Sequence, residues 1–209
     1  GTRLSPLTKA VNKQLLPLYD KPLIFYPLSI LMLAGIRNIL IIANEGQEKN
    51  FFNILGTGKR FGITIKYKIQ KKPRGIADAF ILGKNFIKAD NVALILGDNF
   101  FYGQSLTGKL LKAKTHNLGA TVFLKKVNNP NSFGVAVIKN AQITNIVEKP
   151  KKFISNQAIT GLYFFDNEVV KIASKIRPSK RNELEITDVL KSYQNNKKLK
   201  YEEIGRGAI

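Results

Sequence analysis

The stretch Val92-Ala93-Leu94-Ile95-Leu96-Gly97-Asp98-Asn99 decides the fold of this chain. Five apolar residues that end in a Gly-Asp-Asn turn predict a strand buried on both faces of a parallel sheet. Ligands of open α/β sheets bind beyond the carboxyl ends of the strands, so Asp98 and Asn99 are expected to face a ligand. A lone carboxylate there suits Mg²⁺, which is typically held by one or two carboxylates and substrate phosphates. Asp and Asn are also common turn residues, so the rest of the chain must decide between a ligand-binding role and a purely structural one.

Length and composition indicate one globular unit. The 209 residues are 44% hydrophobic, which is enough for a single core, and we expect one domain over 1–209. The absence of cysteine excludes disulfides and thiolate metal sites, and a single histidine argues against a zinc site. No apolar run is long enough to span a membrane. We therefore expect a cytoplasmic protein with no membrane partner.

The charge is unusual, with 34 basic against 14 acidic residues and a net charge of +20. Clustered lysine and arginine would indicate a polyanion partner such as nucleic acid. Here the lysines are spread through every segment and accompany abundant Asn, Ile and Phe, which favours a compositional bias. We expect no specific nucleic-acid partner, although such a surface should attract anionic substrates.

The first residues contain the ingredients of a phosphate-binding loop. Gly1, Thr2 and Arg3 offer a backbone that a ligand can approach, a hydroxyl and a guanidinium. Lys13 follows as a point charge at the edge of an apolar run. Taken alone, Arg3 and Lys13 would more simply be solvated surface. Further on, Lys21-Pro22 predicts a helix that runs toward Gly35.

A predicted edge strand over 63–70 (ITIKYKIQ) ends at Gln70, a few residues before Gly75. A glutamine at a strand end can offer a donor and an acceptor to a base edge, and a glycine permits backbone contact with a flat ring. Without other motifs, Gln70 would be an ordinary edge residue. The residues 76–86 are expected to form one amphipathic helix.

The second half of the chain predicts further strands, one of which ends in Glu148-Lys149-Pro150. Neighbouring residues on a strand point to opposite faces, so Glu148 can contact a pair of sugar hydroxyls while Lys149 contacts a phosphate. A solvated strand end is the simpler alternative. Asn182 and Glu185 form a variant capping box for a helix that runs through Tyr193.

Each of these signals is weak alone, but their order resembles the sugar-phosphate nucleotidylyltransferases. The resemblance rests on Gly1-Thr2-Arg3-Leu4, Lys13-Gln14-Leu15-Leu16-Pro17, Tyr19-Asp20-Lys21-Pro22, Leu96-Gly97-Asp98-Asn99, Glu148-Lys149-Pro150 and Gly161-Leu162-Tyr163. Together with Glu183-Leu184-Glu185-Ile186-Thr187-Asp188-Val189, the second motif most resembles the glucose-1-phosphate thymidylyltransferases. The similarity extends over essentially the whole chain.

The resemblance implies a Rossmann-like α/β sandwich of the nucleotide-diphospho-sugar transferase type, with a mostly parallel mixed central sheet flanked by helices. It also implies Mg²⁺-assisted attack of α-D-glucose 1-phosphate on dTTP, giving dTDP-glucose and pyrophosphate as the first step of dTDP-rhamnose-type synthesis. A homotetramer is implied as well. The alternatives are a uridylyl, cytidylyl or adenylyl transferase acting on another sugar phosphate, or a non-catalytic protein that binds polyanions.

The resemblance assigns roles to individual residues. Arg3, Lys13 and Asp98 are the catalytic candidates, with Asp98 as the metal ligand. The nucleotide would be bound by Gly1, Thr2, Arg3, Lys13, Gln14, Gln70 and Gly75. The sugar phosphate would be bound by Asn99, Phe133, Gly134, Glu148, Lys149 and Ile159.

The chain also departs from the family pattern. The family's first strand and the glycines before Gly1 are absent, as is the segment after Gly205 that carries a second metal-binding aspartate. We therefore expect residues 1–209 alone to be inactive or nearly so. Lys71, Lys72 and Arg74 make the turn before Gly75 more basic than is usual, which bears on base selectivity.

Overall fold

The computed structural model describes residues 12–116 and 118–205. Their first half contains η2 (Lys13–Leu15), β1 (Pro17–Leu18), β2 (Lys21–Pro22), α2 (Phe25–Leu33), β3 (Asn38–Asn44), α3 (Glu48–Leu55), η3 (Lys59–Phe61), β4 (Thr64–Gln70), α4 (Asp78–Leu82), α5 (Lys84–Ile87) and β5 (Val92–Ile95). The second half contains α6 (Leu106–Thr115), β6 (Ala120–Lys126), η4 (Pro130–Ser132), β7 (Gly134–Lys139), β8 (Gln142–Glu148), β9 (Gln157–Phe165), α7 (Glu168–Ala173), α8 (Ile186–Asn195) and β10 (Leu199–Glu203).

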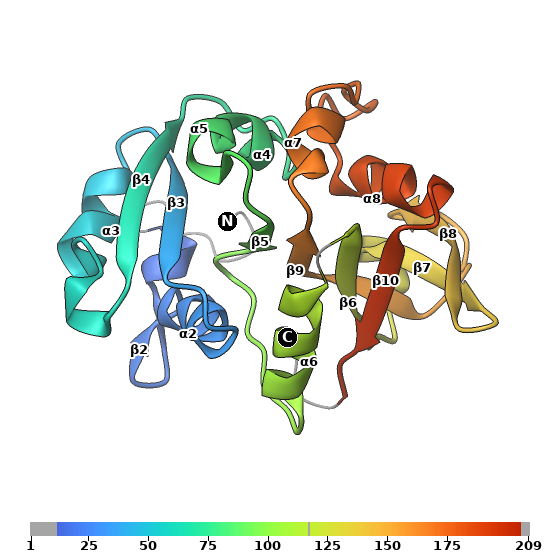
Figure 1. The fold of residues 1–209 in the computed structure, drawn as a ribbon, viewed down its shortest axis with the longest axis horizontal. Helices are drawn as coiled ribbons and strands as arrows, with labels where there is room; N and C mark the ends of the chain where they lie inside the picture. The colour runs from blue at the N-terminus through green and yellow to red at the C-terminus, as the bar shows by residue number, and fades with distance from the viewer. Residues whose placement is uncertain (1–11, 117, 206–209) are drawn as a thin grey trace.

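The largest sheet has six strands in the order β10-β6-β9-β7-β8, with β5 also paired to β9, while β3 and β4 form a separate pair (Figure 1). This is the mixed α/β architecture that the sequence predicts. The balance of directions differs, because the described ladders include five antiparallel and only two parallel pairings. The connection between β7 and β8 is too short for a parallel crossover, and β9 runs antiparallel to β5, β6 and β7.

The strand β5 differs from the expectation of a parallel strand buried on both faces. It runs antiparallel to β9, with Val92 opposite Phe165 and Ile95 opposite Leu162, and its residues are only half-buried. An apolar run cannot reveal the direction of its partner, since both pairings suit it. The carboxyl end of β5 nevertheless leads into Gly97-Asp98-Asn99 as predicted.

The helix predicted from Lys21-Pro22 begins later. Pro22 pairs with Pro17 in the β1–β2 hairpin, and Tyr19 takes a positive φ of 63° in its turn. The helix α2 starts only at Phe25, after the backbone N–H of Leu23 has donated to Leu16. Proline at the start of a helix and proline in a short hairpin give the same sequence signal.

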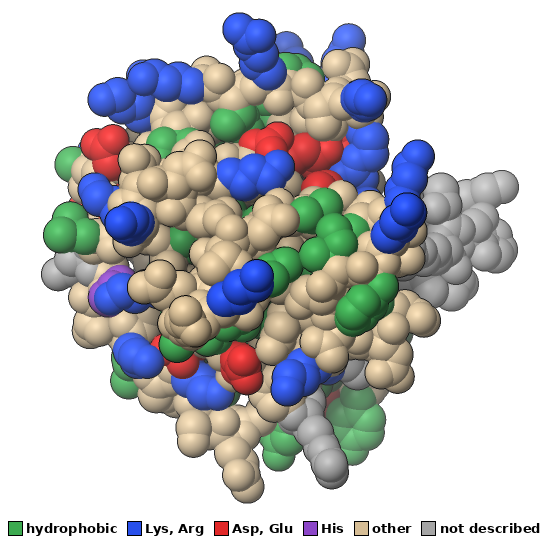
Figure 2. All heavy atoms as spheres, turned by 90° about the vertical axis from the view of Figure 1, so that its right-hand side faces the viewer, with side chains coloured by type: hydrophobic (Ala, Val, Ile, Leu, Met, Phe, Trp, Pro, Cys, Tyr) green, Lys and Arg blue, Asp and Glu red, His purple; other side chains and the backbone are tan. Residues whose placement is uncertain are grey.

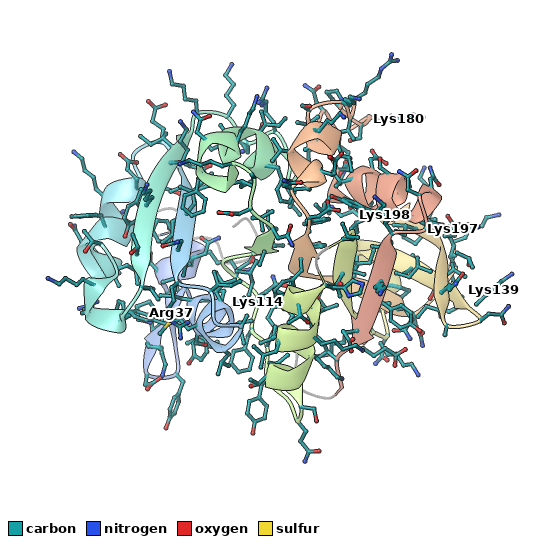
Figure 3. The ribbon with its side chains drawn as sticks, viewed as in Figure 1. Arg37, Lys114, Lys139, Lys180, Lys197 and Lys198 are labelled. Carbon is teal, nitrogen blue, oxygen red and sulfur yellow. The ribbon has the colours of Figure 1, made fainter. Side chains whose placement is uncertain are left out.

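Basic side chains complete the carboxyl end of α2. Gly35 adopts φ +70° just after the helix, as its predicted role as a stop requires. Arg37 donates to the Met32 carbonyl at 2.8 Å and Lys114 donates to the Gly35 carbonyl at 3.1 Å. These two side chains, labelled in Figure 3, therefore add hydrogen bonds at this helix end, where the Met32 carbonyl also accepts from the Gly35 backbone N–H at 2.9 Å.

Helices cover both faces of the six-stranded sheet. The helices α4, α7 and α8 pack on one face around Phe80, Val169 and Leu190, and α6 packs on the other around Leu110 and Phe164. A third apolar cluster joins α2 and α3 to the β3–β4 pair. Within the described ranges, no helix combines the length and apolarity needed to cross a bilayer.

A buried carboxylate ties three of these elements together. Asp166, only 5% exposed, follows β9 and accepts from the Gly119 backbone N–H at 2.7 Å and from the Tyr193 hydroxyl at 2.5 Å. Burial, and then the hydrogen bond to Asp166, raise the pKa of Tyr193. The tyrosine therefore remains a hydrogen-bond donor at neutral pH and links α8 to the sheet.

Replacing Tyr193 by phenylalanine should lower the free energy of unfolding by about 1–3 kcal/mol, because a buried carboxylate loses a donor. Tyr201→Phe is the matched control, since Tyr201 packs against the same cluster but is only half-buried. Urea denaturation followed by circular dichroism measures both. Equal losses in the two variants would contradict a special role for the Asp166 hydrogen bond.

Candidate functional site

A cavity of about 790 Å³ lies where β5 ends and the edge of β9 is uncovered between β5 and β7. Its volume suits a substrate the size of a nucleotide or sugar nucleotide. It is lined by eight of the predicted binding residues, which are Gln70, Gly75, Asn99, Phe133, Gly134, Glu148, Lys149 and Ile159. Segments that are far apart in the sequence therefore converge here as predicted.

A second cavity of about 1150 Å³ adjoins the first and shares Gln70, Gly75, Ile76 and Leu96 with it. It lies between β3 and β5 and is bordered by Gln14 and Gly97. We assign the site to the smaller cavity because eight of the predicted binding residues line it, whereas the larger one is lined by only three of them, Gln14, Gln70 and Gly75. The predicted residues Gly1, Thr2 and Arg3 lie outside the described residues.

Lys13 and Asp98, predicted independently, form an ion pair. The Lys13 ammonium lies 2.9 Å from Asp98 Oδ2, although 85 residues separate the two in sequence. Both side chains remain about one-third exposed, at 37% and 31%, so both can still reach a ligand. Gln14 lies beside them, because a Cβ added to Gly97 would come within 3.0 Å of Gln14 Cγ.

Asn99 connects the turn after β5 to β9. Its Oδ1 accepts from the Gly161 backbone N–H at 3.0 Å, and its Nδ2 donates to Asp98 Oδ1 at 3.2 Å. A Cβ on Gly161 would lie 2.7 Å from that oxygen, so the contact requires glycine. Asn99 therefore holds the Asp98 carboxylate in place, and its predicted contact with a sugar phosphate stays a prediction.

Gly134 and Glu148 face each other across the β7–β8 ladder. A Cβ on Gly134 would lie 2.9 Å from Thr187 Cγ2 and 3.2 Å from Glu148 Oε2. Any side chain at 134 would displace one of these groups, so glycine keeps this end of the cavity open. The Thr187 hydroxyl is buried and makes no hydrogen bond in the described part of the chain.

Glu148 and Lys149 line the same cavity, whereas strand alternation predicts opposite faces. The strand β8 ends at Glu148, and Lys149 adopts a positive φ of 42° while its N–H donates to the Phe133 carbonyl at 3.0 Å. Positive φ is uncommon for a residue with a side chain and costs conformational energy. This turn allows Glu148 and Lys149 to line the same cavity.

Sequence reasoning missed Arg181, which lies at the centre of the acidic wall of the cavity. Its guanidinium contacts Glu148 at 3.2 Å, Glu183 at 3.4 Å and Glu185 at 2.8 Å. The predicted capping box is therefore wrong: Asn182 has φ 62°, and Glu185 accepts from Arg181 and Ser179 instead of closing a cap. The sequence signal for this contact was the position of Arg181 shortly before the acidic residues Glu183 and Glu185.

Glu148 is electrostatically constrained. Burial, and then the negative charge of Glu185, raise its pKa above the ordinary value of 4.5, although Arg181 and Lys149 oppose the rise. Three carboxylates share a single guanidinium here. A ligand that donates hydroxyl hydrogens to Glu148 would relieve this excess of acceptors.

Gln70 and Gly75 also line the cavity. A Cβ on Gly75, which has φ +103°, would come within 2.5 Å of the Leu184 carbonyl oxygen. Glycine is thus needed here for packing against Leu184, whether or not a flat ring also lies against it. The single predicted helix over 76–86 is divided into α4 and α5 at Gly83.

The basic surface is not concentrated at this site. Figure 2 shows Lys and Arg side chains scattered over the whole visible face. Of the residues labelled in Figure 3, Lys139, Lys197 and Lys198 lie toward β8 and β10, whereas Arg37 and Lys114 lie near α2 and α6. On the face shown, this scatter is the pattern predicted from the sequence.

Comparison with known proteins gives consistent matches. Residues 1–208 match the family described as "Nucleotidyl transferase". The glucose-1-phosphate thymidylyltransferase of Neisseria meningitidis is 51% identical over 99% of this chain and 72% of its own length. A Bacillus anthracis structure assigned to the same enzyme and solved with sucrose has a TM-score of 0.91 at 37% identity, covering 98% of this chain and 82% of its own. A UDP-glucose pyrophosphorylase complexed with UDP-glucose has a TM-score of 0.83 at 25% identity, covering 99% and 88%.

The raised pKa of Glu148 predicts a pH-dependent gain of stability in Glu148→Gln. Ionised Glu148 costs the folded state free energy, and this cost is absent at pH values below 4.5 and grows as pH rises through the raised folded pKa. The variant should therefore unfold at a higher temperature than the wild type at pH 8 but not at pH 4. Glu183→Gln, at a more exposed carboxylate, is the control. A variant that is less stable at every pH would show that the Arg181 contact dominates.

Proposed function

The chain belongs to the nucleotidyl transferase family, and on this premise we propose that it joins dTTP to α-D-glucose 1-phosphate, giving dTDP-glucose and pyrophosphate. One observation carries the proposal. Candidate groups for a base (Gln70 and Gly75) and for a hexose phosphate (Glu148 and Lys149) line one cavity, and Asp98, paired with Lys13, accepts a hydrogen bond from the neighbouring lining residue Asn99. Curated relatives named for this activity match nearly the whole chain and support the choice of substrates.

The cavity divides naturally between the two substrates. Of its lining residues, Gln70 and Gly75 are assigned to the thymine base, and Gly134 and Glu148 to the hexose. Positive charge for the phosphates comes from Lys149 and Arg181, which line the cavity, and from Lys13, which pairs with Asp98. Glu148 is suited to hexose hydroxyls because a carboxylate only accepts hydrogen bonds when ionised.

The reaction needs positioning and charge neutralisation rather than a protein nucleophile. A phosphate oxygen of glucose 1-phosphate attacks the α-phosphorus of dTTP in line. The new O–P bond forms as the bond from that phosphorus to the departing pyrophosphate breaks. Lys149 and Arg181 hold the attacking phosphate, while Lys13 neutralises the triphosphate, so no covalent enzyme intermediate is required.

Asp98 fits a role as a Mg²⁺ ligand. It is a partly exposed carboxylate at the end of β5, held by Asn99 Nδ2 on one oxygen and by Lys13 on the other. In the part of the chain that the structure describes, no cluster of three or more His, Cys, Asp or Glu side chains is suited to a metal. Mg²⁺ is typically held by one or two carboxylates together with substrate phosphates, so Asp98 alone is a suitable protein ligand. The ion would supply charge neutralisation at the triphosphate.

Further parts of this proposal rest on the family resemblance. Gly1, Thr2 and Arg3 are proposed to bind the triphosphate, and Ile159 and Phe133 to pack against the hexose. We also propose that the protein acts in the cytoplasm as a homotetramer and that its product enters dTDP-rhamnose-type synthesis. The nearest alternative is the same chemistry with UTP, which the similarity to a UDP-glucose pyrophosphorylase makes worth testing.

Replacing Asp98 by asparagine should lower turnover by about 100-fold or more, since a charge that binds the metal and orients Lys13 is lost. Pyrophosphate release by the full-length protein is measured with Mg²⁺, glucose 1-phosphate and each of dTTP, UTP, CTP and ATP. Asp20→Asn is the control, because Asp20 pairs with Lys21 in the exposed β1–β2 turn. Its activity should stay within about twofold of the wild type.

Each outcome of this assay is informative. Release that favours dTTP and is lost only in Asp98→Asn supports the proposal. Release that favours UTP would change the assigned nucleotide from dTTP to UTP but would support the same type of reaction. An Asp98→Asn protein as active as Asp20→Asn would contradict the metal role, and no release with any triphosphate would contradict the function.

A further inference from the structure

The carboxamide of Gln70 is held by a buried carboxylate that the proposed reaction does not use. Gln70 ends β4, and its Nε2 donates to Asp78 Oδ2 at 3.0 Å. Asp78, at the first residue of α4, is only 1% exposed. Its other oxygen, Oδ1, accepts from Arg74 Nη2 at 2.6 Å. Arg74, Asp78 and Gln70 thus form a chain of charge-assisted hydrogen bonds that leads to the cavity.

This chain fixes which end of the carboxamide faces a ligand. A carboxylate has acceptors only, so the group of Gln70 that turns toward Asp78 must be the amide nitrogen. The carbonyl oxygen Oε1 then points away from Asp78. A free glutamine could present either end to a base, as the sequence alone allows, but here the oxygen is the end turned away from Asp78.

The turn that carries Arg74 and Asp78 is itself anchored. The Leu184 backbone N–H donates to the Arg74 carbonyl at 2.6 Å, and the Leu184 carbonyl accepts from the Ala77 N–H at 3.2 Å. The close approach of Gly75 to Leu184 makes this pairing possible. Asp78 is therefore positioned by backbone contacts that do not depend on a bound nucleotide.

We infer that Asp78, held by Arg74, is a positioning residue that presents Gln70 Oε1 to the N3–H of a thymine or uracil base. The inference deepens the proposed function and rests on it. Thymine and uracil carry a hydrogen at N3, whereas cytosine has a lone pair there, which would face the lone pairs of Oε1. A buried acceptor left facing another acceptor loses its hydrogen bond, and this loss selects against cytosine.

The basic residues that precede Gly75 take on different roles under this inference. Arg74 contributes to base selection, since its guanidinium holds Asp78. Lys71 and Lys72 are exposed and form no ion pair in the described structure. Of the three basic residues in this turn, only Arg74 therefore contributes to base selectivity.

Asp78→Asn tests the inference, because asparagine can accept from or donate to Gln70 and so permits the carboxamide to turn over. The ratio of kcat/KM for dTTP to that for dCTP should fall by about 10- to 100-fold. Asp78→Glu retains an acceptor-only group and should retain most of the ratio. Lys72→Gln, in the same turn, should leave the ratio within about twofold.

A purely structural role for Asp78 predicts a different result. It would lower the melting temperature and reduce turnover of both nucleotides alike, leaving the ratio unchanged in Asp78→Asn, and that outcome would overturn the inference. If the full-length wild type releases no pyrophosphate, the proposed function fails, but the dissociation constants of dTTP and dCTP still test Asp78 through the same ratio.

A measurement on the wild type keeps the inference testable if Asp78→Asn does not fold. The imino proton of ¹⁵N3-labelled dTTP is followed by NMR with and without the protein. Slow exchange of this proton with water in the complex is expected if Oε1 accepts it. Exchange as fast as in the free nucleotide would overturn the inference.

Discussion

The hydrogen bond from the Gly161 backbone N–H to Asn99 Oδ1 is the contact on which the site depends. It attaches the turn after β5 to β9 just where the edge of β9 is left uncovered and a cavity opens. The same asparagine donates to Asp98, so one side chain sets both the wall of the cavity and the position of its carboxylate. A larger residue at 161 would separate the two strands.

The rest of the site is a balance of charges around that fixed point. Lys13 neutralises Asp98 at one side, while Arg181 alone faces Glu148, Glu183 and Glu185 at the other. This second group has more acceptors than donors until a ligand arrives. Three unfavourable features occur in this group: the raised pKa of Glu148, the positive φ of Lys149, and the buried Thr187 hydroxyl without a hydrogen bond in the described part of the chain. Such features are typical of functional sites.

Local sequence motifs identified candidate residues, but they could not show how these residues are arranged. Local motifs placed Asp98, Glu148 and Lys149 at strand ends, and the strands themselves were found because apolar runs and alternation are local properties. Strand direction at β5 depends on a partner 70 residues away, and the approach of Arg181 to Glu148 depends on how α8 packs. The role of Asp78 was hidden for the same reason, because its carboxylate reads as an ordinary helix residue until Gln70 is placed beside it.

Amide hydrogen exchange with and without dTDP-glucose tests the central claim most directly, since it locates a bound sugar nucleotide without relying on turnover. The account predicts slower exchange over 70–77, 96–99, 132–135 and 147–149, which surround the cavity, and little change in α3 or at the β7–β8 turn. Protection confined to other regions, or none at saturating dTDP-glucose, would contradict the assignment of this cavity as the substrate site.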